Sequence, residues 1–83
     1  MDVLSDTVDL MLSDDHKDRF VAEYMQLYIR TERLKAMLHK YRAGTLDFTP
    51  ACPIDILEEQ ASIMDEYLQI LEKRASIEGI ELS

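Results

Sequence analysis

Apolar and small residues recur at helical spacing in two long segments of the chain. In the first, residues 14–42, steps of four and three connect Phe20, Tyr24, Leu27, Thr31, Leu34, Leu38 and Tyr41. In the second, residues 53–77, the same steps connect Leu57, Ala61, Met64, Leu68, Leu71 and Ala75. This repeat is typical of a helix that packs lengthwise on another helix. We therefore predict an all-α protein built on a long antiparallel helical hairpin.

The ends of both predicted helices carry suitable capping residues. The Ser13 hydroxyl can accept a hydrogen bond from a free backbone N–H, so the first helix is expected to start there. Gly44 fits the left-handed residue that ends a helix. Pro53 suits the first turn of the second helix, which we expect to stop before Gly79. Residues 43–52 then form a connector.

The predicted domain spans residues 1–83 and includes two less regular parts. Residues 1–12 form an N-terminal extension, in which Leu4, Val8 and Met11 or Leu12 favour a short docked helix. In the connector, Leu46 and Phe48 are expected to anchor the chain to the core.

Each predicted helix also carries apolar residues outside its main stripe. These are Ile56, Ile63, Tyr67 and Ile70 on the second helix, and Met25, Ile29 and Ala36 on the first. A single hairpin cannot cover both rows, and each large apolar side chain left in water forfeits roughly 1.5–3 kcal/mol. We therefore expect the chain to self-associate into a homo-oligomeric helical bundle. In the alternative, the N-terminal segment folds over one of the rows.

The composition narrows the classes of function. A net charge of −8 over 83 residues argues against duplex nucleic acid as a partner. A run of apolar residues long enough to cross a bilayer is missing from the sequence, and its acidic start is unlike a signal peptide, so we expect a soluble intracellular protein with no membrane partner. The single cysteine, Cys52, favours neither a disulfide framework nor a metal site.

The sequence offers little support for catalysis. His16 and His39 lie 23 residues apart on one predicted helix, about 35 Å, so they cannot share a site within one chain. The paired acids Glu58-Glu59 and Asp65-Glu66 lie on predicted solvent faces. We expect a non-enzymatic protein without a cofactor or a bound metal.

Cationic residues concentrate in the middle of the chain. Residues 16–42 carry seven bases and three acids, whereas residues 43–83 carry two bases and nine acids. On the first helix, four side chains lie within about 40° of one another around the helix axis, at the edge of the core stripe. They are Tyr24, Tyr28, Lys35 and Arg42, and a second cationic flank contains Arg30, Arg33 and Lys40.

Two interpretations of the row of tyrosines and bases remain open. Phenol rings and cations suit the stacking of a nucleobase and the neutralisation of phosphate. Alternatively, these are ordinary side chains at a core edge that pair with the acidic second helix.

The sequence also resembles a known family. The segment AEYMQLYIRTERLKAMLHKY is followed by the C-terminal pattern L-x-x-Q-x-x-x-M-x-x-Y-x-x-x-L-x-x-R, formed by Leu57, Gln60, Met64, Tyr67, Leu71 and Arg74. Over about residues 16–78 the chain is similar to small phage proteins that include the anti-CBASS sponges, which sequester the cyclic oligonucleotide signals of bacterial defence.

The resemblance implies a helical protein in the host cell cytoplasm that assembles as hexamers built from dimers. It further implies cyclic dinucleotides held between protomers without degradation, and in some members cyclic trinucleotides at a separate site. By position, Tyr24 would stack on a base, and Lys40 or its neighbour His39 would meet phosphate, assisted by Arg42 or Lys35. Arg74 would serve the trinucleotide site.

A protein-interaction module is the alternative function. A small phage or mobile-element adaptor would lay an apolar face on a helix of a host protein. Its acidic surface would then occupy a basic host groove in the manner of a nucleic acid.

Overall fold

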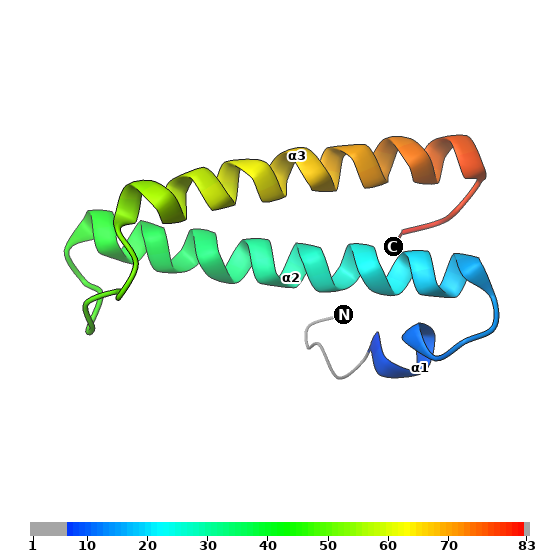
Figure 1. Ribbon diagram of the computed structural model, residues 1–83, viewed down its shortest axis with the longest axis horizontal. Helices are drawn as coiled ribbons and strands as arrows, with labels where there is room; N and C mark the ends of the chain where they lie inside the picture. The colour runs from blue at the N-terminus through cyan, green and yellow to red at the C-terminus, as the bar shows by residue number, and fades with distance from the viewer. Residues whose placement is uncertain (1–6, 83) are drawn as a thin grey trace.

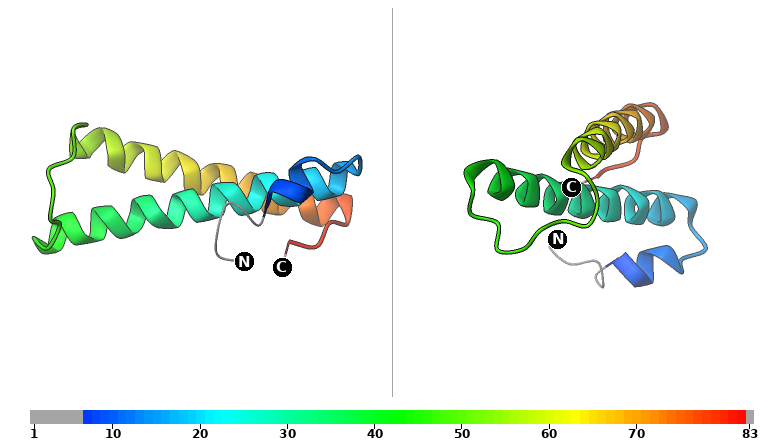
Figure 2. Two further views of the ribbon diagram at one scale, coloured as in Figure 1. Left: turned by 90° about the horizontal axis from the view of Figure 1, so that it is seen from below. Right: turned by 60° about the vertical axis from the view of Figure 1, so that its left-hand side comes forward.

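The computed structural model of the chain describes residues 7–82 (Figure 1). All regular structure within this range is helical, in the order α1 (Val8–Met11), α2 (His16–Ala43) and α3 (Ile54–Glu78). The two long helices lie side by side and run in opposite directions, joined at one end by the connector (Figures 1 and 2). The short α1 packs against α2 on the side away from α3. The prediction of an all-α chain is confirmed.

The start of α2 lies two residues beyond the predicted one. Asp15 is the N-cap, and its carboxylate accepts a hydrogen bond from the Lys17 backbone N–H at 2.9 Å. The Ser13 hydroxyl instead accepts from the Asp15 N–H and donates to the Asp18 carboxylate at 2.8 Å. The prediction of Ser13 as the cap was wrong, because the short carboxylate of Asp15 reaches the free N–H of Lys17, the second residue of the helix.

Glycines end both long helices. Gly44 has φ 74° and Gly79 has φ 69°, the left-handed conformation that a residue without a Cβ adopts at little cost. The Thr45 N–H then reaches back to the Lys40 carbonyl at 2.9 Å. The helix ending predicted at Gly44 is confirmed, and α3 begins directly after Pro53, which occupies its N-cap position.

The core lies between α2 and α3, at the end remote from the connector. Phe20 of α2 packs with Leu71 and Ala75 of α3 and with Ile80, which follows Gly79 as the chain turns back toward the helices. Both predicted stripes face this contact, although Tyr41, at the connector end, is exposed. The prediction that Tyr41 belongs to the core was therefore wrong.

The helix α1 covers part of the surplus apolar row on α2. The Gln26 side chain donates a hydrogen bond to the Thr7 hydroxyl at 2.9 Å. Ile29, one turn further along that face, is buried. The N-terminal segment thus lies over part of this row, whereas Ala36 at its far end is exposed.

The surplus row on α3 stays in solvent. Ile56, Ile63 and Ile70 are each at least half exposed. In the connector, Phe48 is also exposed, so the expectation that it anchors the core was wrong. Among residues 7–82, neither long helix is apolar enough over a sufficient length to cross a bilayer.

Candidate functional site

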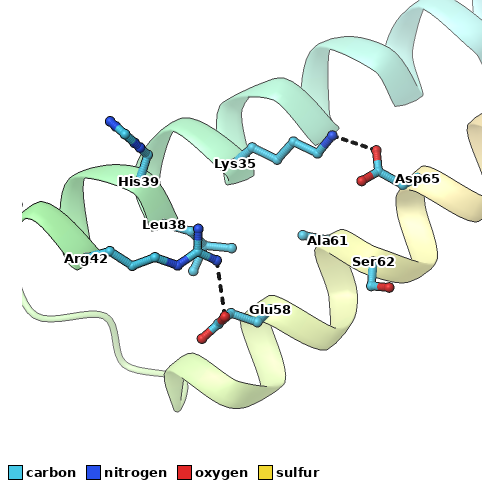
Figure 3. Close-up of a pocket in the computed structure, with 8 residues that line it drawn as sticks. All are labelled: Lys35, Leu38, His39, Arg42, Glu58, Ala61, Ser62 and Asp65. Atoms are coloured by element: carbon cyan, nitrogen blue, oxygen red, sulfur yellow. Dashed lines mark hydrogen bonds and ion pairs between the residues drawn. The ribbon is translucent and has the colours of Figure 1, made fainter.

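The candidate site lies along one edge of the contact between α2 and α3. Figure 3 shows Lys35 and Arg42 on α2 facing Asp65 and Glu58 on α3, with His39 on α2 beside them. These residues line an open pocket of about 490 Å³, with Leu38, Ala61 and Ser62 completing its walls. The pocket brings together three of the seven predicted ligand-binding residues.

Each strong cation in the pocket already has an anionic partner. The Lys35 ammonium lies 2.7 Å from the Asp65 carboxylate, and the Arg42 guanidinium lies 3.1 Å from the Glu58 carboxylate (Figure 3). The hydrogen bond to Asp65 raises the pKa of Lys35, against a smaller opposing effect of desolvation. All four side chains are substantially exposed, so each pair contributes little to stability.

The two tyrosines of the row stack on each other two to three turns before the pocket. The ring centroids of Tyr24 and Tyr28 are 6.2 Å apart with planes inclined by 30°. The Tyr24 hydroxyl donates a hydrogen bond to the Glu72 carboxylate at 2.8 Å. Burial, and secondly that hydrogen bond, raise the pKa of Tyr24 to about 12. Tyr28, by contrast, exposes about half of its surface.

The acids that face this row were missed by sequence reasoning. Glu58, Asp65 and Glu72 follow one another at intervals of seven residues, which places them on one side of α3. Their partners on α2 are Arg42, Lys35 and Tyr24. Glu58 and Asp65 were predicted to lie on solvated faces, although their seven-residue spacing was a signal that they share an edge. The interpretation in which the row pairs with the acidic second helix is therefore observed within one protomer.

The other predicted site residues lie elsewhere. Lys40 does not line the pocket, because five residues advance it about 140° around α2 from Lys35. His39 lies at the rim, with its imidazole directed away from Glu58 (Figure 3). Arg74, near the other end of the hairpin, places its guanidinium 4.7 Å from the centre of the Phe20 ring.

These positions limit the kinds of ligand that the edge between α2 and α3 can bind. Phenol rings and cations are suited to binding an aromatic anion, and within residues 7–82 the acidic, histidine and cysteine side chains form no cluster that could hold a metal ion. In the pocket, two carboxylates balance the two strong cations. An anionic ligand must therefore displace the acids of the chain.

The comparison with known families identifies the chain. The family model described as Sequestin matches residues 14–77. The chain belongs to the Sequestin family. This match agrees with the resemblance to phage sponges of cyclic nucleotide signals. The match includes all of α2 and all of α3 except Glu78, so the hairpin is the part that this sequestin shares with its family. Neither the curated proteins nor the solved structures contain a match.

Proposed function

We propose that this sequestin is a non-enzymatic sponge that binds cyclic dinucleotides in the host cytoplasm and keeps them from their effector. The observation that carries the proposal is the family match over both long helices. Sequestration needs only affinity and an excess of protein over signal, so no bond in the ligand is broken. The edge between α2 and α3 supplies groups of the required chemistry.

The tyrosine pair and the pocket cations supply complementary interactions for a nucleotide. An exposed aromatic ring such as Tyr28 offers a stacking surface for a base. Arg42 can bind a phosphate through two parallel N–H donors, and Lys35 contributes a point charge. Exchange of Asp65 or Glu58 for phosphate costs little because both ion pairs are exposed.

The positions of Tyr24 and Lys40 favour a ligand shared between protomers. Sixteen residues separate them on α2, which corresponds to about 24 Å along the helix and about 160° around it. One small cyclic nucleotide cannot touch both in a single protomer. We therefore propose that Tyr24 of one protomer stacks on the base while Lys40 or His39 of another meets phosphate, within a homohexamer.

Arg74 lies apart from the residues that we propose bind the cyclic dinucleotide. Its guanidinium lies over the Phe20 ring and 3.1 Å from the Glu78 carboxylate, near the end of the hairpin opposite the connector. It cannot join the pocket residues on one ligand within a protomer. We assign Arg74 to a second site, for a cyclic trinucleotide.

Native mass spectrometry tests the proposed function directly. The full chain is measured alone and with a mixture of cyclic dinucleotides and trinucleotides, with the corresponding linear nucleotides as the matched control. We expect a hexamer that gains the mass of cyclic ligands only, and release of intact ligand after heat denaturation. Absence of any bound cyclic nucleotide would overturn the sponge. Release of a linearised product would instead show a hydrolase.

A further inference from the structure

The exposed face of α3 has a heptad pattern of its own. Isoleucines recur every seven residues at positions 56, 63, 70 and 77 and are between 50 and 84 % exposed. Gln60, Tyr67 and Arg74 alternate with them at steps of four and three. We call these seven residues the α3 seam. A repeat of this kind, about 32 Å long, is the pattern of a helix that pairs with another helix.

The isoleucines of the α3 seam take no part in the hairpin core, whereas Arg74 of the seam covers the ring of Phe20 at its edge. Leu71 and Ala75, which pack on α2, lie about 100° around α3 from Ile63 and Ile70 at the middle of the seam. Asp65 of the pocket lies about 200° around the helix from Ile63. A helix docked on the seam therefore leaves both the core and the pocket undisturbed.

We propose that the α3 seam binds the α3 seam of a second copy of this chain in antiparallel orientation. The inference rests on the self-association contained in the proposed function and identifies the surface that performs it. Antiparallel pairing packs Tyr67 against Ile63 of the second copy, and Gln60 against its Ile70. Every polar seam residue then lies opposite an isoleucine.

Charge selects this orientation. Glu59, Glu66 and Lys73 flank the seam on its outer side, at intervals of seven residues. In the antiparallel pair, Glu59 of each copy faces Lys73 of the other, which makes two ion pairs related by the two-fold axis. The two Glu66 side chains meet at that axis, and their repulsion offsets part of this gain. Parallel pairing would instead bring the two Arg74 side chains together and leave Glu59 without a cation.

Two polar seam residues are already held against α2. The Tyr67 hydroxyl donates a hydrogen bond to the Glu23 carboxylate, which ties the ring to the hairpin edge. The Arg74 guanidinium is held over the Phe20 ring and lies 3.1 Å from the Glu78 carboxylate. Both side chains are thus oriented before association, which lowers the entropy lost on binding.

Charge reversal tests the orientation. Sedimentation equilibrium is measured on the full chain and on Glu59→Lys, Lys73→Glu and the double variant that carries both. We expect each single variant to raise the dissociation constant of the pair about tenfold, because two attractive contacts become repulsive. The double variant restores attraction, so its dissociation constant returns to within about twofold of the original.

Matched controls separate the seam from a general effect of charge. Glu32→Lys and Lys17→Glu make the same charge changes on exposed parts of α2, and we expect them to leave association unchanged. Ile63→Asp removes a seam contact and is expected to abolish the pairing while circular dichroism shows an intact helical hairpin. Single reversals without effect, or a double variant in which the losses add, would overturn the antiparallel seam.

The result that would overturn the proposed function differs from the one that would overturn the seam. Calorimetry of the original chain with cyclic dinucleotides runs in parallel with sedimentation. A chain that pairs through the seam but binds no cyclic nucleotide overturns the sponge and retains the seam. A chain that binds the nucleotide and associates regardless of the seam variants overturns the seam alone. A monomeric chain that binds the nucleotide overturns the seam and the sharing of ligand between protomers, but not the sponge.

Discussion

The ammonium of Lys35 lies 2.7 Å from the carboxylate of Asp65, across the edge where α2 meets α3. Seven residues further along α2, the Arg42 guanidinium lies 3.1 Å from the Glu58 carboxylate. The protein therefore places its own anions beside the two cations that we propose bind phosphate. In that proposal, these acids orient the cations before binding and compete with the ligand afterwards.

Removal of one competing acid should strengthen ligand binding. Asp65→Asn keeps the shape of the side chain but frees the positive charge of Lys35. Calorimetry is expected to show cyclic dinucleotide affinity raised by about three- to tenfold, the scale of an exposed ion pair. Glu81→Gln, which removes one negative charge beyond the end of α3, is the control and should have little effect because salt screens distant charges. Unchanged or weaker binding by the Asp65 variant would remove Lys35 from the phosphate site.

The aromatic ring of Tyr24 should matter more than its hydroxyl. Tyr24→Ala is expected to cost about 1–3 kcal/mol of cyclic dinucleotide binding through lost stacking. Tyr24→Phe keeps the ring and loses only the hydrogen bond to Glu72, so its affinity should stay close to the original. Calorimetry of both variants, with native mass spectrometry to verify assembly, makes the comparison. Equal affinity of the alanine variant and the original chain would place the base elsewhere.

Stability should fall in strongly alkaline solution. The pKa of Tyr24 is raised to about 12 by burial and then by the hydrogen bond to Glu72. The hydrogen bond to Glu23 raises the pKa of Tyr67, and that to Asp65 raises the pKa of Lys35. Since all three pKa values are higher in the folded state, their contributions are complete below about pH 10 and are lost as the pH rises, that of Tyr24 as the pH approaches 12.

Urea unfolding at stepped pH measures this loss. The free energy of unfolding of the original chain is expected to decline between about pH 10 and pH 12. The decline for Tyr24→Phe should be smaller than that of the original chain. The difference between the two should be less than about 1 kcal/mol, because solvent screens the exposed edge. An identical decline in both proteins would contradict the coupling of Tyr24 to Glu72.

The core contact of Leu71 should dominate the stability of the hairpin. Leu71 is 1 % exposed and packs on Phe20, so Leu71→Ala is expected to cost about 2–5 kcal/mol of unfolding free energy. Leu12, at 78 % exposure, provides the matched control, and Leu12→Ala should cost less than about 0.5 kcal/mol. Urea unfolding at equal chain concentration compares the two. A similar cost in both variants would contradict the location of the core.

Local patterns allowed most of the fold to be predicted. The steps of four and three that include Phe20, Leu38 and Leu71 correctly identified buried positions, because helical spacing alone determines which residues share a face. Gly44 marked the end of α2, since its left-handed conformation is a local requirement. The cap at Asp15 was missed because neighbouring Ser and Asp side chains compete for the same free N–H groups.

The candidate site was predictable only in part. The positions of Lys35 and Arg42 on one edge of the first helix followed from their spacing, and the structure brings them together in one pocket. Their pairing with Asp65 and Glu58 depends on the register between two antiparallel helices. That register is determined by how core side chains interdigitate, which neither helix encodes alone.

By itself, the sequence determined the elements of this sequestin: two long helices, the faces that they bury, the left-handed glycine that ends the first, and the surplus apolar rows. These follow from the periodicity and local chemistry of a single chain segment. Only the tertiary structure decided which surplus row α1 covers, which acid meets each cation, and that the α3 seam stays exposed. Those outcomes depend on contacts between segments distant in sequence, whose relative placement comes from packing.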